Sequence, residues 1–116
     1  MSKIEKKAVR QAFRDAVFKR AGYRCQGPGC RFVSSQKKAE EELDSHHITE
    51  RFIFPNGGYI AANGIALCPS CHLKAEEVLQ GKANHKGFFQ RDLYSIIDSS
   101  FDKAREADKE QGECNG

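Results

Sequence analysis

The sequence lacks the long apolar segments that a membrane protein needs. None of its hydrophobic runs approaches the roughly 18 residues that read as a membrane-spanning helix, and no charged-then-apolar leader with a small-residue cleavage site is present. Both absences argue against a membrane span and against secretion. We therefore expect a cytoplasmic protein with no membrane partner.

Hydrophobic residues are also few. They make up 39% of the 116 residues, which is enough for one small domain with a thin core. A bound metal ion would help such a domain to fold, because it adds the cross-links that a small apolar core does not supply. No repeat and no second domain is evident, so we expect a single domain over residues 1–116.

The net charge is only +3, but the charge is unevenly distributed. Residues 1–40 contain 11 Lys and Arg against 3 Asp and Glu, a local net charge of +8, whereas the other 76 residues carry −5. A basic N-terminal third can lie against nucleic-acid phosphates, and such binding is sensitive to salt. The alternative is a solvated helix face, which is common in Lys-rich amphipathic helices.

Hydrophobic spacing predicts helices at both ends of the chain. Residues 1–22 form a basic N-terminal segment in which apolar residues recur at helical intervals over 3–20. A second apolar stripe predicts a C-terminal helix over residues 88–110, followed by a flexible tail at 111–116. Between them, the polar residues 34–42 predict a surface loop.

Two short apolar segments predict strands in the middle of the chain. Residues 43–48 and 64–67 have the length of strands, and a break at residues 55–58 separates them. Pro69 suits the first turn of a helix that ends before Gly81. The predicted order is therefore strand, loop, strand, helix.

Four of the five cysteines occur as two close pairs. Four residues separate Cys25 from Cys30, two separate Cys68 from Cys71, and 37 residues lie between the pairs. In a reducing compartment such pairs indicate metal ligands, and four thiolates favour a tetrahedral zinc ion. A four-sulfur site leaves no open position for water, so its role would be structural. Cys114 has no metal-binding pattern around it and is expected to be a solvated bystander.

Three histidines form a second group of candidate ligands. His46 and His47 are neighbours on a predicted strand, so one can bind a metal ion while the other faces a substrate. His72 and Glu76 lie four residues apart on the predicted helix, within reach of a single ion. Imidazole and carboxylate ligands suit a divalent transition metal or magnesium. Asp44 shares the strand face of His46 and is a candidate partner for a ligand.

The segments Asp44-Ser-His-His-Ile48 and Asn63-Gly-Ile-Ala-Leu-Cys-Pro-Ser-Cys-His72 resemble the HNH endonucleases, whose name describes this order of His, Asn and His. The resemblance covers about residues 23–80, and the nine-residue step from Asn63 to His72 agrees with the family pattern. It implies an α+β fold: a small ββα-metal core, held together by the four-cysteine zinc site and flanked by the N- and C-terminal helices.

The same resemblance implies roles for individual residues. His47 would act as general base on a water molecule, with a pKa near neutrality, and Asn63 would orient the loop and the His47 ring. His46 and His72 would hold the catalytic metal, with Glu76 as a further candidate ligand where some relatives carry a second helical histidine. Many relatives have Asp in place of His46, and a histidine there resembles the colicin-type nucleases. This imidazole-rich site leans toward zinc, nickel or manganese, while magnesium prefers oxygen ligands.

The implied activity is metal-dependent hydrolysis of phosphodiester bonds in DNA, with contacts mainly to the phosphate backbone. Four basic residues surround the proposed centre in the sequence and are candidates for these contacts: Arg51, Lys74, Lys82 and Lys86. The nearby aromatic residues are expected to pack in the core: Phe52, Phe54, Tyr59, Phe88 and Phe89.

Two other functions stay open at this point. A non-catalytic four-cysteine zinc module that binds nucleic acid through its basic helix would explain the cysteines and the charge equally well. A structural or protein-interaction zinc domain is the second alternative. Neither explains why histidine, asparagine and histidine occur in nuclease order, and this order favours the endonuclease.

Overall fold

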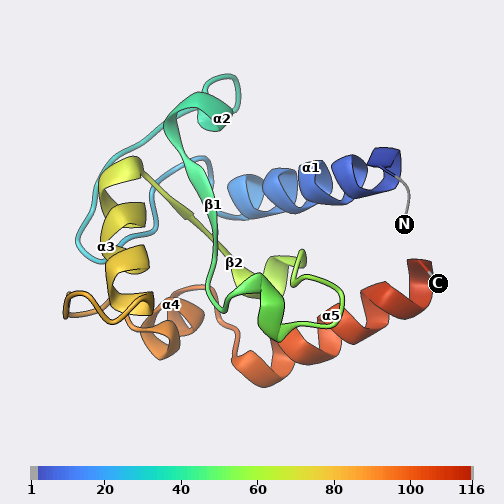
Figure 1. Ribbon diagram of the computed structural model, residues 1–116. Coiled ribbons are helices and arrows are strands. Elements are labelled where there is room, and N and C mark those ends of the chain that lie inside the picture. The colour runs from blue at the N-terminus through green and yellow to red at the C-terminus, as the bar shows by residue number, and fades with distance from the viewer. Residues whose placement is uncertain (1–2, 116) are drawn as a thin grey trace.

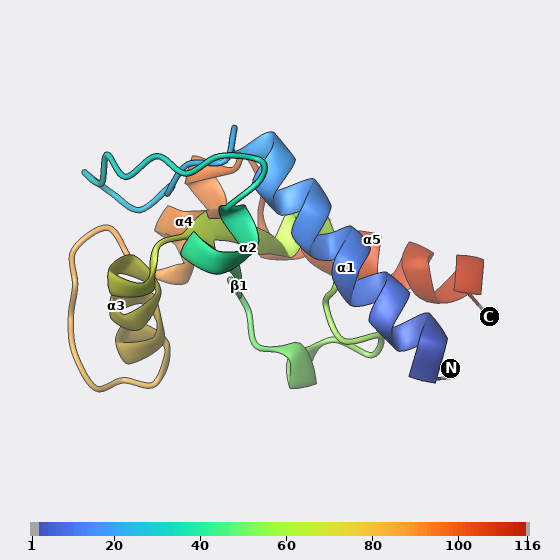
Figure 2. The ribbon, with the colours of Figure 1, turned by 90° about the horizontal axis from the view of Figure 1, so that it is seen from above.

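The computed structural model describes the backbone of residues 3–115 and the side chains of residues 6–112. Its elements are α1 (Lys3–Arg20), α2 (Ala39–Glu42), β1 (Asp44–His47), η1 (Arg51–Ile53), η2 (Ala61–Asn63), β2 (Gly64–Leu67), α3 (Pro69–Leu79), α4 (Gln90–Ile96) and α5 (Phe101–Asn115). The predicted α+β class is confirmed. The strands lie at the centre with α3 on one side, while α1 and α5 both extend toward the other side, where the two termini lie (Figures 1 and 2).

The two strands form an antiparallel pair near the middle of the molecule. His46 pairs with Ile65 and His47 with Gly64, and Ile48 N beyond the strand end donates to Asn63 O at 2.9 Å. All four residues of β2 are buried, whereas β1 is buried fully only at His46. The structure therefore confirms both predicted strands and makes β2 the inner one.

Helix α1 packs directly on β2, as its amphipathic pattern predicts. Val17 is fully buried and Phe13 nearly so. A Cβ atom on Gly64 would lie 2.5 Å from Val17 Cγ2 and 2.7 Å from the Phe13 ring, closer than carbon atoms can approach. Glycine at the start of β2 therefore permits the contact between helix and strand.

Helix α3 begins and ends where the sequence predicts. Pro69 occupies its first turn, and Gly81 follows it with a φ of +73°, a conformation that favours glycine. The predicted loop over residues 34–42 is only partly a loop, because Ala39–Glu42 forms the short helix α2. The Ala39 methyl group is buried against the core. This apolar contact was not predictable from the mostly polar sequence of the segment.

The C-terminal segment differs from the prediction of one helix over 88–110 and a tail over 111–116. It forms two helices, α4 and α5, and α5 continues to Asn115. Between them Asp98 has a φ of +54°, and Ser99 N donates to Tyr94 O at 2.9 Å, which ends α4. The break lets the two helices cover different parts of the core. No helix in residues 3–115 is long and apolar enough to span a bilayer.

We expect Gly64→Ala to lower the free energy of unfolding by about 1–3 kcal/mol, because the added methyl group forces α1 away from β2. Urea denaturation monitored by circular dichroism measures the loss. Leu73→Ala serves as the control: this α3 side chain is 62% exposed, so its removal should change stability by no more than about 0.5 kcal/mol. Equal stability of Gly64→Ala and the wild type would contradict the tight packing.

Candidate functional site

The two cysteine pairs come together at one place. Cys25 and Cys30 lie in the turn after α1, Cys68 precedes α3, and Cys71 lies in its first turn. Their Sγ atoms are all within 4.8 Å of one another, and Cys30 Sγ is 3.9 Å from Cys68 Sγ. Zn–S bonds of ~2.3 Å in a tetrahedron place sulfur atoms ~3.8 Å apart, so the spacing fits a metal ion. The side chain of Cys114 lies outside the described residues.

Hydrogen bonds and burial act in opposite directions on the ionisation of the cysteine thiols. Gly27 N and Cys68 N donate to Cys25 Sγ at 3.4 and 3.2 Å, and such bonds stabilise a thiolate. Burial, together with the neighbouring Cys25, raises the pKa of the Cys71 thiol. Ionisation of all four cysteine thiols therefore needs a divalent cation to balance their negative charge. A Cβ atom on Gly27 would lie 2.5 Å from Cys71 Sγ, so glycine is required for this close approach.

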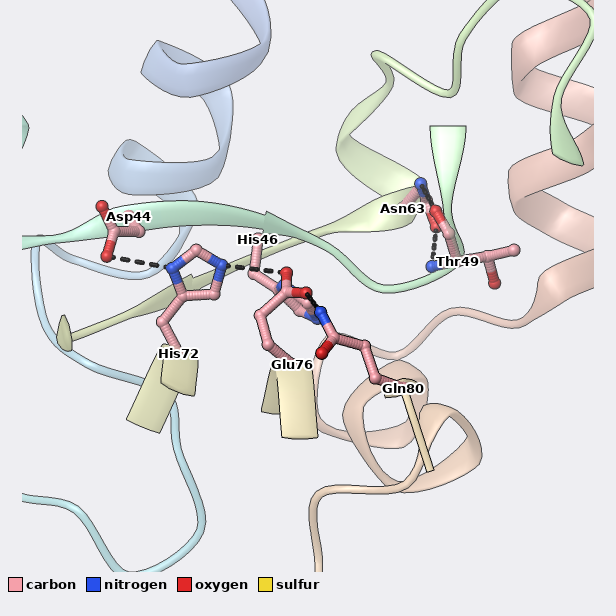
Figure 3. Close-up of polar contacts among 7 residues, drawn as sticks. All are labelled: Asp44, His46, Thr49, Asn63, His72, Glu76 and Gln80. Atoms are coloured by element: carbon pink, nitrogen blue, oxygen red, sulfur yellow. Dashed lines mark hydrogen bonds and ion pairs between the residues drawn. The ribbon is translucent and has the colours of Figure 1, made fainter. Parts of the chain in front are cut away.

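A second cluster joins β1 to α3. Glu76 Oε1 is 3.3 Å from His46 Nδ1 and 3.3 Å from His72 Nε2 (Figure 3). One ligand atom from each of these three residues lies within 4.8 Å of the other two. The spacing of His72 and Glu76 on one face of α3 is therefore as predicted, and β1 supplies His46 opposite them.

His46 provides the test of whether a cation fits this cluster. The ring is 2% exposed, and its Nδ1 makes no hydrogen bond to the described residues, although it lies 3.3 Å from Glu76 Oε1. Burial, with smaller effects of the His72 and His47 rings, lowers the pKa of His46 to about 3, which keeps the ring uncharged. An imidazole nitrogen without a hydrogen bond and a neighbouring carboxylate oxygen can both act as ligands of a divalent cation. The cluster therefore fits such an ion.

Asp44 fixes the orientation of the other histidine. Its Oδ2 lies 3.1 Å from His72 Nδ1, so Nε2 of the same ring points toward Glu76 (Figure 3). A carboxylate on the far nitrogen of a ligating imidazole sets its tautomer and increases its basicity. Asp44 is thus the partner of His72, on the strand face that the sequence indicates. Gln80 Nε2 makes a long contact of 3.5 Å with Glu76 Oε2.

His47 points to the opposite face of β1, toward α1. Its ring stacks on Phe13 with a centroid distance of 4.6 Å and meets the edge of Tyr59 at 4.8 Å. Burial, followed by the positive charge of Arg51, lowers the pKa of His47 to about 4. This is below the near-neutral value expected from the sequence, because aromatic rings rather than water surround the imidazole. His47 is therefore uncharged at neutral pH.

Asn63 is fully buried and braces the chain between the strands. Its Oδ1 accepts hydrogen bonds from Thr49 N at 2.9 Å and from the Tyr94 hydroxyl at 2.8 Å. Its Nδ2 donates to Thr49 O at 3.0 Å and to Gly58 O at 3.3 Å. Among the described residues no hydrogen bond joins Asn63 to His47, so any effect on that ring passes through the backbone of the loop.

Both faces of β1 open into a single hollow of about 690 Å³, lined by His46, His47, His72 and Glu76 together with residues of α1 and of the loop after β1. Two arginines enter it: Arg10 Cζ and Arg51 Cζ lie 5.5 and 5.7 Å from the Tyr59 ring centroid, and Arg51 Nη1 donates to the Tyr59 hydroxyl. The hollow therefore combines a candidate cation site, an uncharged imidazole, the Glu50 carboxylate and two guanidinium groups.

This arrangement agrees with the comparison to known families: residues 25–77 match the model of the HNH endonucleases. This segment is similar to an HNH endonuclease domain. Comparisons with curated proteins and with solved structures found no significant match. The matched segment includes the cysteine cluster, both strands and most of α3, whereas α1, α4 and α5 lie outside it.

The sequence did not reveal part of the lining of the candidate site. The sequence indicated Arg10 only as one of many basic residues of the N-terminal helix, and Tyr59 and Phe52 were expected to pack in the core. In the structure all three line the hollow, and Phe52 is 78% exposed. Of the four basic residues near the centre in sequence, only Arg51 is among the lining residues; Lys74 instead lies over the Phe88 ring at 5.8 Å. The signal that could have found Arg10 is its position one helical turn before Phe13.

Cobalt is a suitable probe of the cysteine cluster, since thiolate coordination gives Co²⁺ an intense charge-transfer absorption. We expect one equivalent of Co²⁺ added to metal-stripped protein to produce this band, and Cys30→Ser to weaken it strongly because one of four sulfurs is lost. Cys114→Ser and His72→Ala are the controls and should keep the band. A band of equal strength in Cys30→Ser would refute the four-sulfur site.

Proposed function

We propose that the protein is a metal-dependent HNH endonuclease that hydrolyses phosphodiester bonds in DNA. One observation carries the proposal: a single hollow holds a three-ligand cluster, a separate uncharged histidine and two arginines. Hydrolysis of a phosphodiester needs an activated water, stabilisation of charge on the phosphate and help for the departing 3′ oxygen. The residues of the hollow match these three requirements.

His46, His72 and Glu76 are the proposed ligands of the catalytic ion. When bound, a divalent cation supplies Lewis-acid stabilisation of the phosphate and of the leaving oxygen. Two imidazoles and one carboxylate favour zinc, nickel or manganese over magnesium. Asp44 keeps His72 Nε2 available for this purpose through the bond to Nδ1.

His47 is the proposed general base. The imidazole takes a proton from the water whose oxygen attacks phosphorus, and the bond from phosphorus to the 3′ oxygen breaks. Burial makes His47 a weaker base than free imidazole, but it also keeps the ring unprotonated throughout the neutral pH range. Phe13 and Tyr59 hold the ring by stacking and by edge contact, which limits its rotation. Asn63 supports this geometry by bracing the loop after β1.

Arg10 and Arg51 are the proposed contacts to the DNA backbone. Both guanidinium groups lie beside Tyr59 in the hollow, and Arg10 belongs to the basic helix α1. Contacts to phosphate carry no direct sequence information, so we expect weak sequence preference from this domain. The cysteine cluster is proposed to hold a structural zinc ion, and its four free thiols favour a reducing compartment such as the cytoplasm.

The first test is nicking of supercoiled plasmid by protein that retains its tightly bound zinc, with magnesium, manganese, nickel or zinc added in turn. We expect metal-dependent nicking, and a loss of about 10²- to 10⁴-fold in rate for His47→Ala because the general base is removed. Agarose gels of the topoisomers measure the rate.

His85→Ala is the matched control for that experiment, because His85 pairs with Glu77 at 3.1 Å and does not line the hollow. It should cleave like the wild type. If no metal supports cleavage but DNA still binds in a salt-sensitive manner, the endonuclease proposal is wrong and the non-catalytic zinc module replaces it.

Binding to DNA tests the arginines separately. In the cleavage-deficient His47→Ala background we expect Arg10→Ala to weaken duplex binding equally for unrelated sequences. The slope of log Kd against log salt should fall by about 1, since one phosphate contact is lost. Fluorescence anisotropy over a salt series measures both. Arg105→Ala is the control, because this exposed α5 side chain pairs with Asp102 and does not line the hollow. An unchanged slope in Arg10→Ala would remove Arg10 from the interface.

A further inference from the structure

Asp108 is a fully buried carboxylate in α5, outside the segment that matches the HNH family. A buried carboxylate is unfavourable unless hydrogen bonds replace its lost water. Both oxygens of Asp108 have such partners: Asn56 N donates to Oδ2 at 3.0 Å, and Gly58 N donates to Oδ1 at 2.8 Å. The carboxylate therefore holds two alternate N–H groups of the loop between β1 and β2.

Two further features tie this loop to α5. Asn56 Nδ2 donates to the backbone oxygen of Asp108 at 3.0 Å. One helical turn later, a Cβ atom on Gly112 would lie only 2.1 Å from Asn56 Nδ2, so α5 leaves room for the Asn56 side chain there. Gly58 itself has a φ of +68°, and a Cβ atom on it would lie 2.6 Å from the Phe54 ring. The loop and the helix are thus matched in shape as well as in hydrogen bonds.

The loop that Asp108 holds leads directly to the proposed catalytic groups. Gly58 O accepts the bond from Asn63 Nδ2, and the next residue, Tyr59, places its ring edge against His47. The Tyr59 hydroxyl in turn accepts a bond from Arg51. A continuous path of contacts therefore runs from α5 through the loop to the imidazole and to one guanidinium group.

We propose that Asp108 is a positioning residue of the nuclease site: it holds the loop of residues 54–60 so that Tyr59 stays against His47 and keeps its contact with Arg51. The inference rests on the proposed endonuclease function. It gives α5 a role in the active centre that acts through the loop, because no hydrogen bond or ion pair joins its described residues to His46, His72 or Glu76. The ligands His46, His72 and Glu76 lie on β1 and α3, so Asp108 controls the base and the phosphate contact and leaves the metal site unaffected.

The experiment compares Asp108→Asn with the wild type in steady-state cleavage of a short duplex. Asparagine keeps one acceptor oxygen but places an N–H₂ group opposite the second backbone N–H. The loop therefore loses one of the two hydrogen bonds that join its backbone to this side chain. We expect kcat to fall by about 10- to 100-fold through misplacement of the base. We also expect KM to rise several-fold, and the affinity of the histidine cluster for added Mn²⁺ or Ni²⁺ to stay unchanged. Partial unfolding would instead lower the apparent kcat at unchanged KM.

Two more variants separate positioning from general stability. Gly112→Ala leaves Asp108 intact but pushes Asn56 away, so it should reproduce the KM and kcat changes in milder form. Asp102→Asn alters a carboxylate on the same helix that is 85% exposed and should behave like the wild type. Native-state hydrogen exchange provides a readout independent of cleavage: the amides of Asn56 and Gly58 should exchange faster in Asp108→Asn, while those of β2 stay protected.

Unchanged kcat and KM in Asp108→Asn, or equal exchange acceleration throughout the core, would overturn the positioning role. If the wild type itself cleaves no DNA, the proposed function fails. The effect of Asp108 on the loop can still be tested in that case by the NMR contact between the Tyr59 and His47 rings. Loss of this contact in Asp108→Asn, with a folded core, would support the positioning, and its persistence would overturn it.

Discussion

The register between β1 and β2 is the constraint on which the proposed active centre depends. Pairing His46 with Ile65 and His47 with Gly64 sends the first imidazole toward α3 and the second toward α1. A slip of one residue would turn His46 away from His72 and Glu76 and turn His47 away from Phe13 and Tyr59. Strands of four residues cannot hold their register alone, so the surrounding elements must do so. Helix α1 seated on Gly64 and the bonds of Asn63 just beyond the strand end provide this constraint.

Polar groups perform much of the cross-linking that a larger apolar core would otherwise perform. Asn63 joins the two ends of the loop and reaches Tyr94 on α4, Asp108 joins the loop to α5, and the four cysteines join the end of α1 to the start of α3. Each connects segments that are far apart in the sequence. Directed bonds of this kind specify one geometry more narrowly than apolar contact does, because their energy depends on angle as well as distance. The site is thus precise despite the small size of the chain.

The electrostatic environment separates two adjacent histidines into different roles. Both are buried enough to be uncharged, but His46 faces the Glu76 carboxylate, whereas His47 faces aromatic rings and feels the positive charge of Arg51. Negative groups around His46 and His72 favour a cation between them. Positive groups around His47 favour an anionic phosphate near it. The proposed division into a metal ligand and a base therefore follows from what lies on each side of one strand.

Local patterns made much of the fold predictable. The helical period of α1, the proline and glycine at the limits of α3 and the short apolar runs of β1 and β2 each depend on neighbouring residues, and all of them are confirmed. The break between α4 and α5 was not predictable in this way. Ile96 and Ile97 continue the apolar stripe into Phe101, but the left-handed conformation of Asp98 separates α4 from α5.

The sequence by itself determined which chemical groups are present and which of them are neighbours along the chain: two cysteine pairs, adjacent histidines on a strand, and His72 four residues before Glu76 on a helix. Only the tertiary structure decided that Arg10, Tyr59 and Phe13 surround His47, that Asp44 pairs with His72, and that Asp108 holds the loop from α5. The reason is physical. The distance between two ligand residues within one turn or helix is set by backbone geometry. Contacts between residues that are tens of positions apart depend on how the helices pack around the sheet, which no local pattern encodes.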